Sequence, residues 1–286
     1  MKNDEMITLA KFLAISGIIL PMLPHKNLIP DINLTPYSIW LATVVVSGIS
    51  YLSYLLKRYV FHESGTLVSG IIGGLYSSTA TISVLARKSR KASEQEATEY
   101  VAAMLLAVSM MFLRFMILIL IFSREIFLSI YPYLLIMSVV SAIVGWFVHS
   151  RQKLPKDTSV ESEEDDSSNP LEFKVALIFA VLFVVFTVLT HYTLVYAGTS
   201  GLNLLSFVSG FSDITPFILN LLQNTGSVAV LIITACSMQS IVRNILVNMF
   251  YALFFAGKRS KLRPWILGGF GAVIVCNLVL LLFFYL

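Results

Sequence analysis

The sequence predicts an all-α protein that crosses a membrane several times. Of its 286 residues, 57% are hydrophobic and only 13% are charged, and its mean hydropathy is +0.83. A soluble domain averages about 25% charged residues. The apolar residues also fall into long segments, and a transmembrane helix needs roughly 17–25 of them. The lipid bilayer is therefore the first partner that the chain requires.

Nine apolar segments are long enough to be transmembrane helices. They cover residues 6–23, 37–56, 66–86, 97–122, 126–149, 171–196, 201–222, 226–256 and 264–286. The first segment carries no cleavage site and is expected to remain as a helix, so that it forms a unit with the outer loop that follows it. The expected units are 1–36 (first helix and outer loop), 37–150 (repeat half 1), 151–170 (linker) and 171–286 (repeat half 2).

The linker at residues 151–170 is polar, and its second half is acidic, which is typical of a disordered connection. Short sequence matches on either side of it suggest that the two halves are an internal repeat of four segments each. They occur in the same order in both halves, which favours the repeat over chance identity. The matches are Gly74-x4-Thr79 with Gly210-x4-Thr215, and Ala107-Val-Ser-Met with Ala235-Cys-Ser-Met.

The distribution of Lys and Arg indicates which segments cross the membrane. If all nine cross, eight basic residues lie on one side and nine on the other, which gives no positive-inside bias. If segments 66–86 and 201–222 instead enter and leave on one side, fifteen basic residues are cytoplasmic and two, Lys26 and Arg124, are outside. This arrangement predicts seven spans, two re-entrant segments and a cytoplasmic N-terminus. Nine ordinary spans are the alternative.

Seven spans and two re-entrant segments make the two halves inverted relative to each other, as in many secondary transporters. The tips of the re-entrant segments would meet near the membrane midplane. Gly74 and Gly210 precede the expected breaks, and Thr79 and Thr215 are expected to cap the half-helices that follow. Pro216 suits the first turn of such a half-helix.

Polar residues inside the apolar segments predict a substrate site between the two tips. A central arginine costs roughly 2.5–3.5 kcal/mol on insertion scales, so its presence suggests a function. An ion pair between Asp213 and Arg243 with a purely structural role is the alternative. The predicted substrate-binding residues are Ser77, Ser78, Thr79, Thr81, Arg114, Asp213, Thr215, Arg243, Asn244 and Asn248.

The charges of these residues weakly favour an anionic substrate. Arg114 and Arg243 exceed Asp213 by one positive charge, and two half-helix N-termini add partial positive charge. A divalent cation would require several carboxylates. The sequence contains no motif for a metal, a cofactor or a nucleotide. It has neither an aspartate dyad nor a deep histidine for catalysis, so we expect that it is not an enzyme, and nothing predicts nucleic-acid binding.

The whole chain resembles an uncharacterised membrane domain, domain of unknown function 4010, found C-terminally in many MgtC/SapB-family proteins. Where that family has a second acidic residue at a tip, this chain has Ser-Asp213-Ile-Thr215, which argues against a divalent cation. The stretches that carry the resemblance are ISGIILPMLPHKNLIP (15–30), VSGISYLSYLLKRY (46–59), GGLYSSTATISVLARKSR (73–90), MFLRFMIL (111–118), NPLEFKVALIFAVLF (169–183) and LSFVSGFSDITPFILNLL (205–222).

These observations leave three functional hypotheses. The favoured one is a small secondary transporter or channel for an ion or small solute, in the cytoplasmic (inner) membrane of a prokaryote. The second, which the resemblance suggests, is a regulatory subunit without flux that binds a separately encoded MgtC-like protein. The third is transport of a divalent cation of the magnesium type. Whether the protein forms a homodimer stays open.

Overall fold

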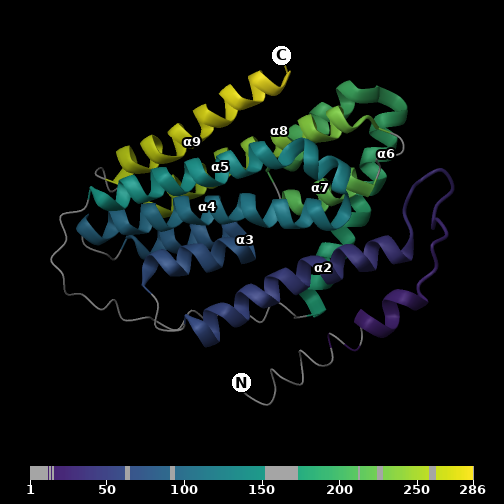
Figure 1. Cartoon of the computed structure of the whole chain (residues 1–286), viewed down its shortest axis with the longest axis horizontal. Helices are drawn as coiled ribbons and strands as arrows, with labels where there is room; N and C mark the ends of the chain where they lie inside the picture. Colours follow the sequence, from purple (N-terminus) through teal and green to yellow (C-terminus); the bar gives the residue numbers. More distant parts are fainter. Residues whose placement is uncertain are drawn as a thin grey trace.

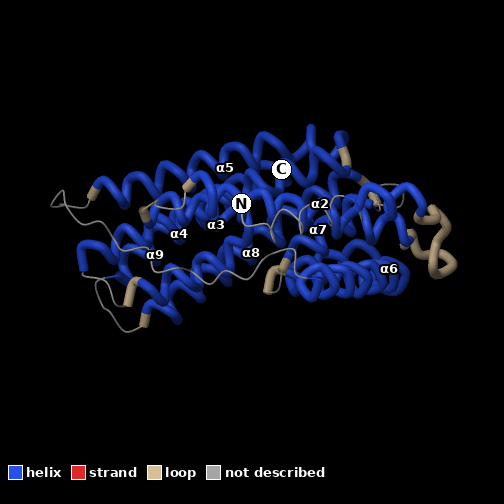
Figure 2. The backbone as a smooth tube through the Cα atoms, turned by 90° about the horizontal axis from the view of Figure 1, so that it is seen from below, coloured by secondary structure: helices blue, strands red, loops and turns tan. Residues whose placement is uncertain are grey.

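The structure is a computed structural model that describes residues 12, 14, 16–61, 65–90, 94–151, 173–211, 213–223, 228–257 and 262–285. Within these residues every regular element is a helix and none is a strand (Figure 2), which confirms the all-α prediction. Residues 16–22 are helical, but most of the first predicted segment lies outside the described residues. The same is true of the predicted linker, of which only residue 151 is described.

Most described helices follow the predicted segments to within a few residues, but the helix that begins at residue 173 continues to residue 209, so the predicted segment 201–222 is divided between this helix and the next. Seven helical stretches are long and apolar enough to cross a membrane, as in a multi-pass membrane protein. The helices are α2 (Pro36–Leu55, extended by the π-helical turn η1 at Leu56–Val60), α3 (Thr66–Lys88), α4 (Glu94–Phe122), α5 (Arg124–Ser150), α6 (Phe173–Ser209), α7 (Ile214–Gln223), α8 (Val230–Ala256) and α9 (Leu262–Tyr285).

Polar capping residues start two of these helices. At α2, Thr35 Oγ1 accepts a hydrogen bond from the Ser38 N–H (3.0 Å) and Ser38 Oγ accepts one from the Thr35 N–H (3.1 Å). This capping box, with Pro36 at the first helical position, satisfies backbone groups that lipid cannot. At α5, Ser123 Oγ accepts from the Ile126 N–H (3.4 Å).

Helix α4 lies at the centre of the bundle, between α3 and α5 (Figure 1). Its residues Val101–Leu105 are all fully buried. Buried polar side chains join the helices on this side, as expected where no water is available. Ser109 Oγ donates to the Ser138 carbonyl (2.8 Å) between α4 and α5, and the Tyr133 hydroxyl donates to Asn277 Oδ1 (2.5 Å) between α5 and α9.

Helix α3 is a hairpin rather than one straight helix. Its backbone breaks at Ser77, where φ is −159° and ψ is 107°. A methyl group at Gly73 would lie 2.5 Å from Thr81 Oγ1. Residues eight apart in a straight helix are separated by about 12 Å along its axis. The chain therefore turns back at Ser77, and we call its two arms, residues 66–76 and 78–88, hairpin 1.

A second hairpin follows a similar reversal in α6. Gly198 has φ 57° and ψ −148°, a backbone conformation that only glycine adopts readily. A methyl group at Gly201 would lie 2.7 Å from Thr193 Cγ2, so the chain runs back on itself after Gly198. After a turn that begins at residues 210 and 211 it reverses again into α7. We call the arms 199–209 and Ile214–Gln223 hairpin 2.

The second arm of hairpin 2 packs on the first part of α6. Asn220 Nδ2 donates to Thr187 Oγ1 at 2.7 Å, and the rings of Phe217 and Phe186 lie 5.7 Å apart. Neither arm is long enough to cross a bilayer, because 10 or 11 helical residues rise only about 16 Å. Both hairpins are thus pairs of half-helices.

Each hairpin packs its first arm against the long helix that follows it, and both do so in the same register. A side chain at Gly70 or Gly74 of hairpin 1 would collide with the backbone of Ala103 or Ala107 in α4. In hairpin 2, Ser206 Oγ donates to Gln239 Oε1 of α8 at 2.8 Å. Two further contacts join hairpin 2 to α8: Asn203 lies against Cys236, and Gly210 lies against Arg243. All five pairs are 33 residues apart.

The two hairpins enter the bundle from opposite ends of α8. Arg90, just after hairpin 1, donates from Nη2 to the Phe254 carbonyl at 3.0 Å and lies against Gly257, at the C-terminal end of α8. Hairpin 2 starts instead beside the N-terminal half of α8, where Asn203 contacts Cys236. The tips of the two hairpins therefore approach each other from opposite ends of the bundle.

This geometry predicts which positions can be labelled from the same side of the membrane. In a chain without Cys236 and Cys276, we expect Gly65→Cys and Lys88→Cys, at the two ends of hairpin 1, to react with impermeant thiol reagents from one side only. That side should be cytoplasmic, because basic residues gather there. Tyr196→Cys, at an 82% exposed position beside Gly198, should react from the other side. Labelling of Gly65→Cys and Lys88→Cys from opposite sides would contradict the hairpin.

Candidate functional site

The tips of both hairpins line one cavity of about 620 Å³. Its polar lining comes from α2, α3, α4, α7, α8 and the turn before α7, and its apolar lining mainly from α4, α6 and α8. The polar residues that line it are Ser47, Ser50, Tyr76, Ser77, Ser78, Thr79, Ser83, Arg114, Asp213, Thr215, Asn244 and Tyr251.

The tip of hairpin 1 is built around Ser77. Its extended backbone ends the first arm, and its Oγ accepts a hydrogen bond from the Ala80 N–H at 3.4 Å, so Ser77 is the N-cap of the second arm. The break releases the backbone carbonyls that end the first arm, which need partners from elsewhere in lipid. One of these carbonyls belongs to Tyr76 and faces α4.

Arg114 supplies the partner for that carbonyl. Its Nη1 donates to the Tyr76 carbonyl oxygen at 2.6 Å, and the residue is only 8% exposed. Its Nε is buried and has no hydrogen-bond partner within the described part of the chain. Arg114 thus holds the broken backbone with one end of its guanidinium group and presents a positive charge to the cavity it lines.

Asp213 builds the tip of hairpin 2. Its Oδ1 accepts a hydrogen bond from the Thr215 N–H at 3.0 Å, which makes Asp213 the N-cap of α7. The residue is exposed and lines the same cavity as Arg114. No ion pair joins these two described side chains. The cavity therefore holds two opposite charges that are not in direct contact.

The capping residues differ from those expected at the two tips. The caps are Ser77 and Asp213, whereas Thr79 and Thr215 each lie two residues further on, inside the following helix. The expectation placed each break too late because it relied on the glycines and threonines of the motif. A backbone break puts the residue at the break itself in the extended conformation, where its side chain can reach the free N–H groups.

The structure brings seven of the ten predicted residues to the cavity and places three elsewhere. Thr81 contacts Gly73 between the arms of hairpin 1. Asn248 is fully buried behind the cavity wall, where its Nδ2 donates to Asn244 Oδ1 at 3.2 Å. Arg243 points away from the cavity. The seven residues that line it are Ser77, Ser78, Thr79, Arg114, Asp213, Thr215 and Asn244.

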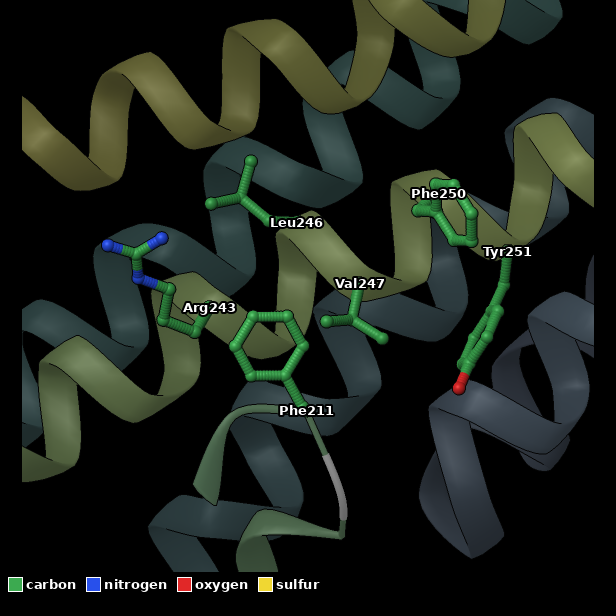
Figure 3. Close-up of a pocket in the computed structure, with 6 residues that line it drawn as sticks. All are labelled: Phe211, Arg243, Leu246, Val247, Phe250 and Tyr251. Carbon is green, nitrogen blue, oxygen red and sulfur yellow. The ribbon is translucent and has the colours of Figure 1, made fainter. Parts of the chain in front are cut away.

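Arg243 lies at the edge of a separate apolar groove of about 410 Å³. Figure 3 shows its guanidinium group turned away from Val247 and Tyr251, which line both this groove and the cavity. The guanidinium carbon lies 3.5 Å from the centre of the Phe207 ring, a cation–π contact that partly replaces water. The side chains of Arg243 and Asp213, which are both described, form no ion pair. The alternative of a purely structural ion pair between them therefore lacks the contact that it requires.

Sequence reasoning missed the contribution of α2. Ser47 and Ser50 are 8% and 7% exposed, and both line the cavity. Their spacing of three residues, continued by Thr43 four residues earlier, places these hydroxyls on one face of a helix. That periodicity was available in the sequence and would have identified α2 as a wall of the site.

The lining of the cavity contains groups that can bind a polar ligand. Its charged groups are one guanidinium and one carboxylate, and its other polar groups are hydroxyls and an amide. Among the described residues, no three His, Cys, Asp or Glu side chains lie close enough together to hold a metal ion. Hydroxyls, a buried arginine and two half-helix N-termini are groups that recognise a polar solute.

Fold and cavity together define a multi-pass helical membrane protein with two broken-helix hairpins whose tips line one cavity. The model of one family, described as "Domain of unknown function (DUF4010)", matches residues 44–256. The chain therefore belongs to this family, which confirms the resemblance seen in its sequence. An uncharacterised protein of Aquifex aeolicus (strain VF5) is 25% identical over 205 residues, which cover 71% of this chain and 87% of the relative. No solved structure matches the chain significantly.

Proposed function

We propose that this protein is a secondary transporter for a small polar solute, which binds in the cavity between the two hairpin tips. One observation carries the proposal: half-helices that enter from opposite ends of the bundle meet at a single cavity that contains a buried arginine. Broken helices whose ends surround a midplane site recur in secondary transporters, because their free N–H and C=O groups can bind a substrate.

The relation between the two halves supports this proposal. The hairpin and the following long helix pack with the same 33-residue separation in both halves, at Gly74 with Ala107 and at Gly210 with Arg243. Ser77 and Asp213 then occupy equivalent positions, each capping the second arm of its hairpin. Two equivalent units that enter from opposite ends form an inverted repeat, the arrangement that lets a carrier open alternately to either side.

In the proposed topology, the protein lies in the cytoplasmic membrane of a prokaryote with its N-terminus inside. Hairpin 1 then enters from the cytoplasm and hairpin 2 from the outside. The charge distribution supports this orientation, because fifteen basic residues lie on the cytoplasmic side and two on the other. Arg87 and Arg90, at the end of hairpin 1, are among the fifteen.

The charges in the cavity favour a substrate with an anionic group over a divalent cation. The free Nε of Arg114 and the N-terminal ends of two half-helices all favour negative charge. A divalent cation prefers six or more oxygen ligands, including several carboxylates. The described lining offers only the carboxylate of Asp213, and one of its oxygens already accepts a backbone hydrogen bond.

Flux through the purified protein tests the proposal. In liposomes, we expect uptake of at least one solute from a panel of inorganic anions, carboxylates, amino acids and divalent cations, above that of empty liposomes. The uptake should saturate with concentration, as expected when a bound state limits transport. Absence of flux for every class would contradict a transporter and favour the regulatory subunit of an MgtC-like partner.

A further inference from the structure

We infer that the solute is a small zwitterion with an apolar body, of the α-amino acid type, whose carboxylate binds Arg114 and whose ammonium group binds Asp213. The inference rests on the proposed function, since it names the substrate class of the same cavity. Three features of the cavity carry it: its size, its two opposite charges, which form no ion pair, and the chemistry of its walls.

The cavity is much larger than an inorganic ion requires. Its volume of about 620 Å³ compares with about 30 Å³ for one water molecule and falls within the roughly 300–1,000 Å³ of small-molecule sites. An inorganic ion would leave most of this space to water or require the tips to close substantially. An organic molecule of the size of an amino acid can contact both tips at once.

The two charges lie in the cavity without neutralising each other. Arg114 is nine-tenths buried and keeps an unpartnered Nε, although its Nη1 is engaged by the Tyr76 carbonyl. Asp213 uses Oδ1 to cap α7, and its carboxylate remains exposed to the cavity. Arg114 is a buried charge with one unpartnered nitrogen, which is costly, and Asp213 is an exposed one. A ligand that carries both opposite charges would pair with both groups together.

The half-helix ends strengthen the same assignment. Ser77 and Asp213 begin helices that run away from the cavity, so the positive ends of both helix dipoles face it. The partial charge at hairpin 1 adds to that of Arg114 and favours a carboxylate there. At hairpin 2 the full negative charge of Asp213 outweighs the partial charge of α7 and leaves this tip attractive to an ammonium group.

The remaining walls are apolar and would receive a hydrocarbon side chain. They come from four helices, α2, α4, α6 and α8, and only apolar side chains contribute to them. Such a wall gains from burying an apolar ligand surface, at about 25 cal/mol per Å². It gains nothing from an inorganic ion. These wall residues are Val46, Met111, Phe115, Ile178, Phe179, Leu182, Val247 and Phe255.

Ligand binding to the full-length protein in detergent tests the inference independently of flux. The probes are L-leucine, 4-methylpentanoate (which lacks the amino group), 3-methylbutan-1-amine (which lacks the carboxylate) and phosphate, with affinity measured by isothermal titration calorimetry. We expect L-leucine, L-valine or L-phenylalanine to bind, and the amino acid to bind at least about tenfold more tightly than its singly charged analogues. Each analogue lacks one charge-assisted contact.

Two variants test which residue binds the ammonium group of the ligand and which binds its carboxylate. Asp213→Asn keeps an N-cap for α7, because asparagine caps as well as aspartate. It should bind L-leucine no better than 4-methylpentanoate, whereas Arg114→Gln should lose affinity for both. A variant that unfolds is recognised by its unfolding temperature, and the preference of the wild-type protein among the four probes still tests the inference.

The outcomes separate this inference from the proposed function. Binding of amino acids without flux would retain the inference and contradict transport. Flux of phosphate or another inorganic ion without amino acid binding would retain transport and overturn the inference. Equal affinity of the wild-type protein for L-leucine and for either singly charged analogue would also overturn it, since one of the two charges would then play no part.

Discussion

Arg114→Gln should reduce substrate affinity by roughly tenfold to a hundredfold and lower flux at subsaturating substrate to the same extent. A hydrogen bond to a charged group contributes about 1.5–3 kcal/mol, and each 1.4 kcal/mol is a factor of ten. Arg114 is the buried cation of the cavity, and glutamine removes its charge while keeping an amide that can donate a hydrogen bond. Calorimetry and liposome uptake measure the two effects.

The loss must be separated from a loss of folding, because Arg114 also binds the Tyr76 carbonyl. Arg114→Lys keeps the charge and should retain more affinity than Arg114→Gln at a similar unfolding temperature. Arg124→Gln, at an exposed position at the start of α5, is the matched control and should behave like the wild type. Full affinity in a folded Arg114→Gln protein would contradict the site.

Arg243→Gln tests whether the second arginine within a long helix also binds the substrate. Arg243 lies outside the cavity, against the Phe207 ring. Its replacement should therefore cost less affinity than the replacement of Arg114. An equal or larger loss of affinity in Arg243→Gln would indicate that the substrate binds in the apolar groove of Figure 3 instead.

Gly74→Val should prevent folding or strongly lower the unfolding temperature. A methyl group at this position would lie 2.6 Å from both the Cα and the carbonyl oxygen of Ala107, and neither backbone atom can move without shifting α4. Overpacking of a closely packed core typically costs about 1–3 kcal/mol, and valine adds two further methyl groups at this position. Thermal unfolding in mild detergent, followed by size-exclusion chromatography, measures the effect.

Gly48→Val is the matched control for this variant. Gly48 lies inside α2, and a methyl group there would have no heavy atom within 4 Å. The substitution should leave the unfolding temperature nearly unchanged. A well-folded Gly74→Val protein with the stability of the control would show that hairpin 1 does not pack on α4 through this glycine.

The sequence alone predicted most of the fold, because it follows from hydrophobicity and charge. Segment 97–122 coincides closely with α4, Glu94–Phe122, since lipid exposure requires an uninterrupted apolar run. The break in segment 66–86 was also expected, from its glycines and hydroxyls. The breaking residue was not, because choosing Ser77 over Thr79 depends on backbone dihedral angles that several neighbouring hydroxyls could adopt.

The candidate site was predicted less completely, because the direction of a side chain depends on packing. Arg114 and Arg243 are both deep arginines in long helices and look alike in the sequence. Only the 33-residue register places Gly210 against Arg243, which directs that side chain towards Phe207 and away from the cavity. Ser47 was overlooked because its spacing with Thr43 and Ser50, which places the three hydroxyls on one helix face, was not considered.

The contact between Arg90 and the Phe254 carbonyl ties the hairpin of one half to a helix of the other half. Arg87 adds a second link, with its guanidinium carbon 4.4 Å from the centre of the Phe255 ring. Phe255 itself lines the cavity. Any displacement of hairpin 1 must therefore carry the end of α8 with it or break these links. In the proposed transporter, a movement of hairpin 1 would therefore be coupled to a rearrangement of the cavity wall at Phe255.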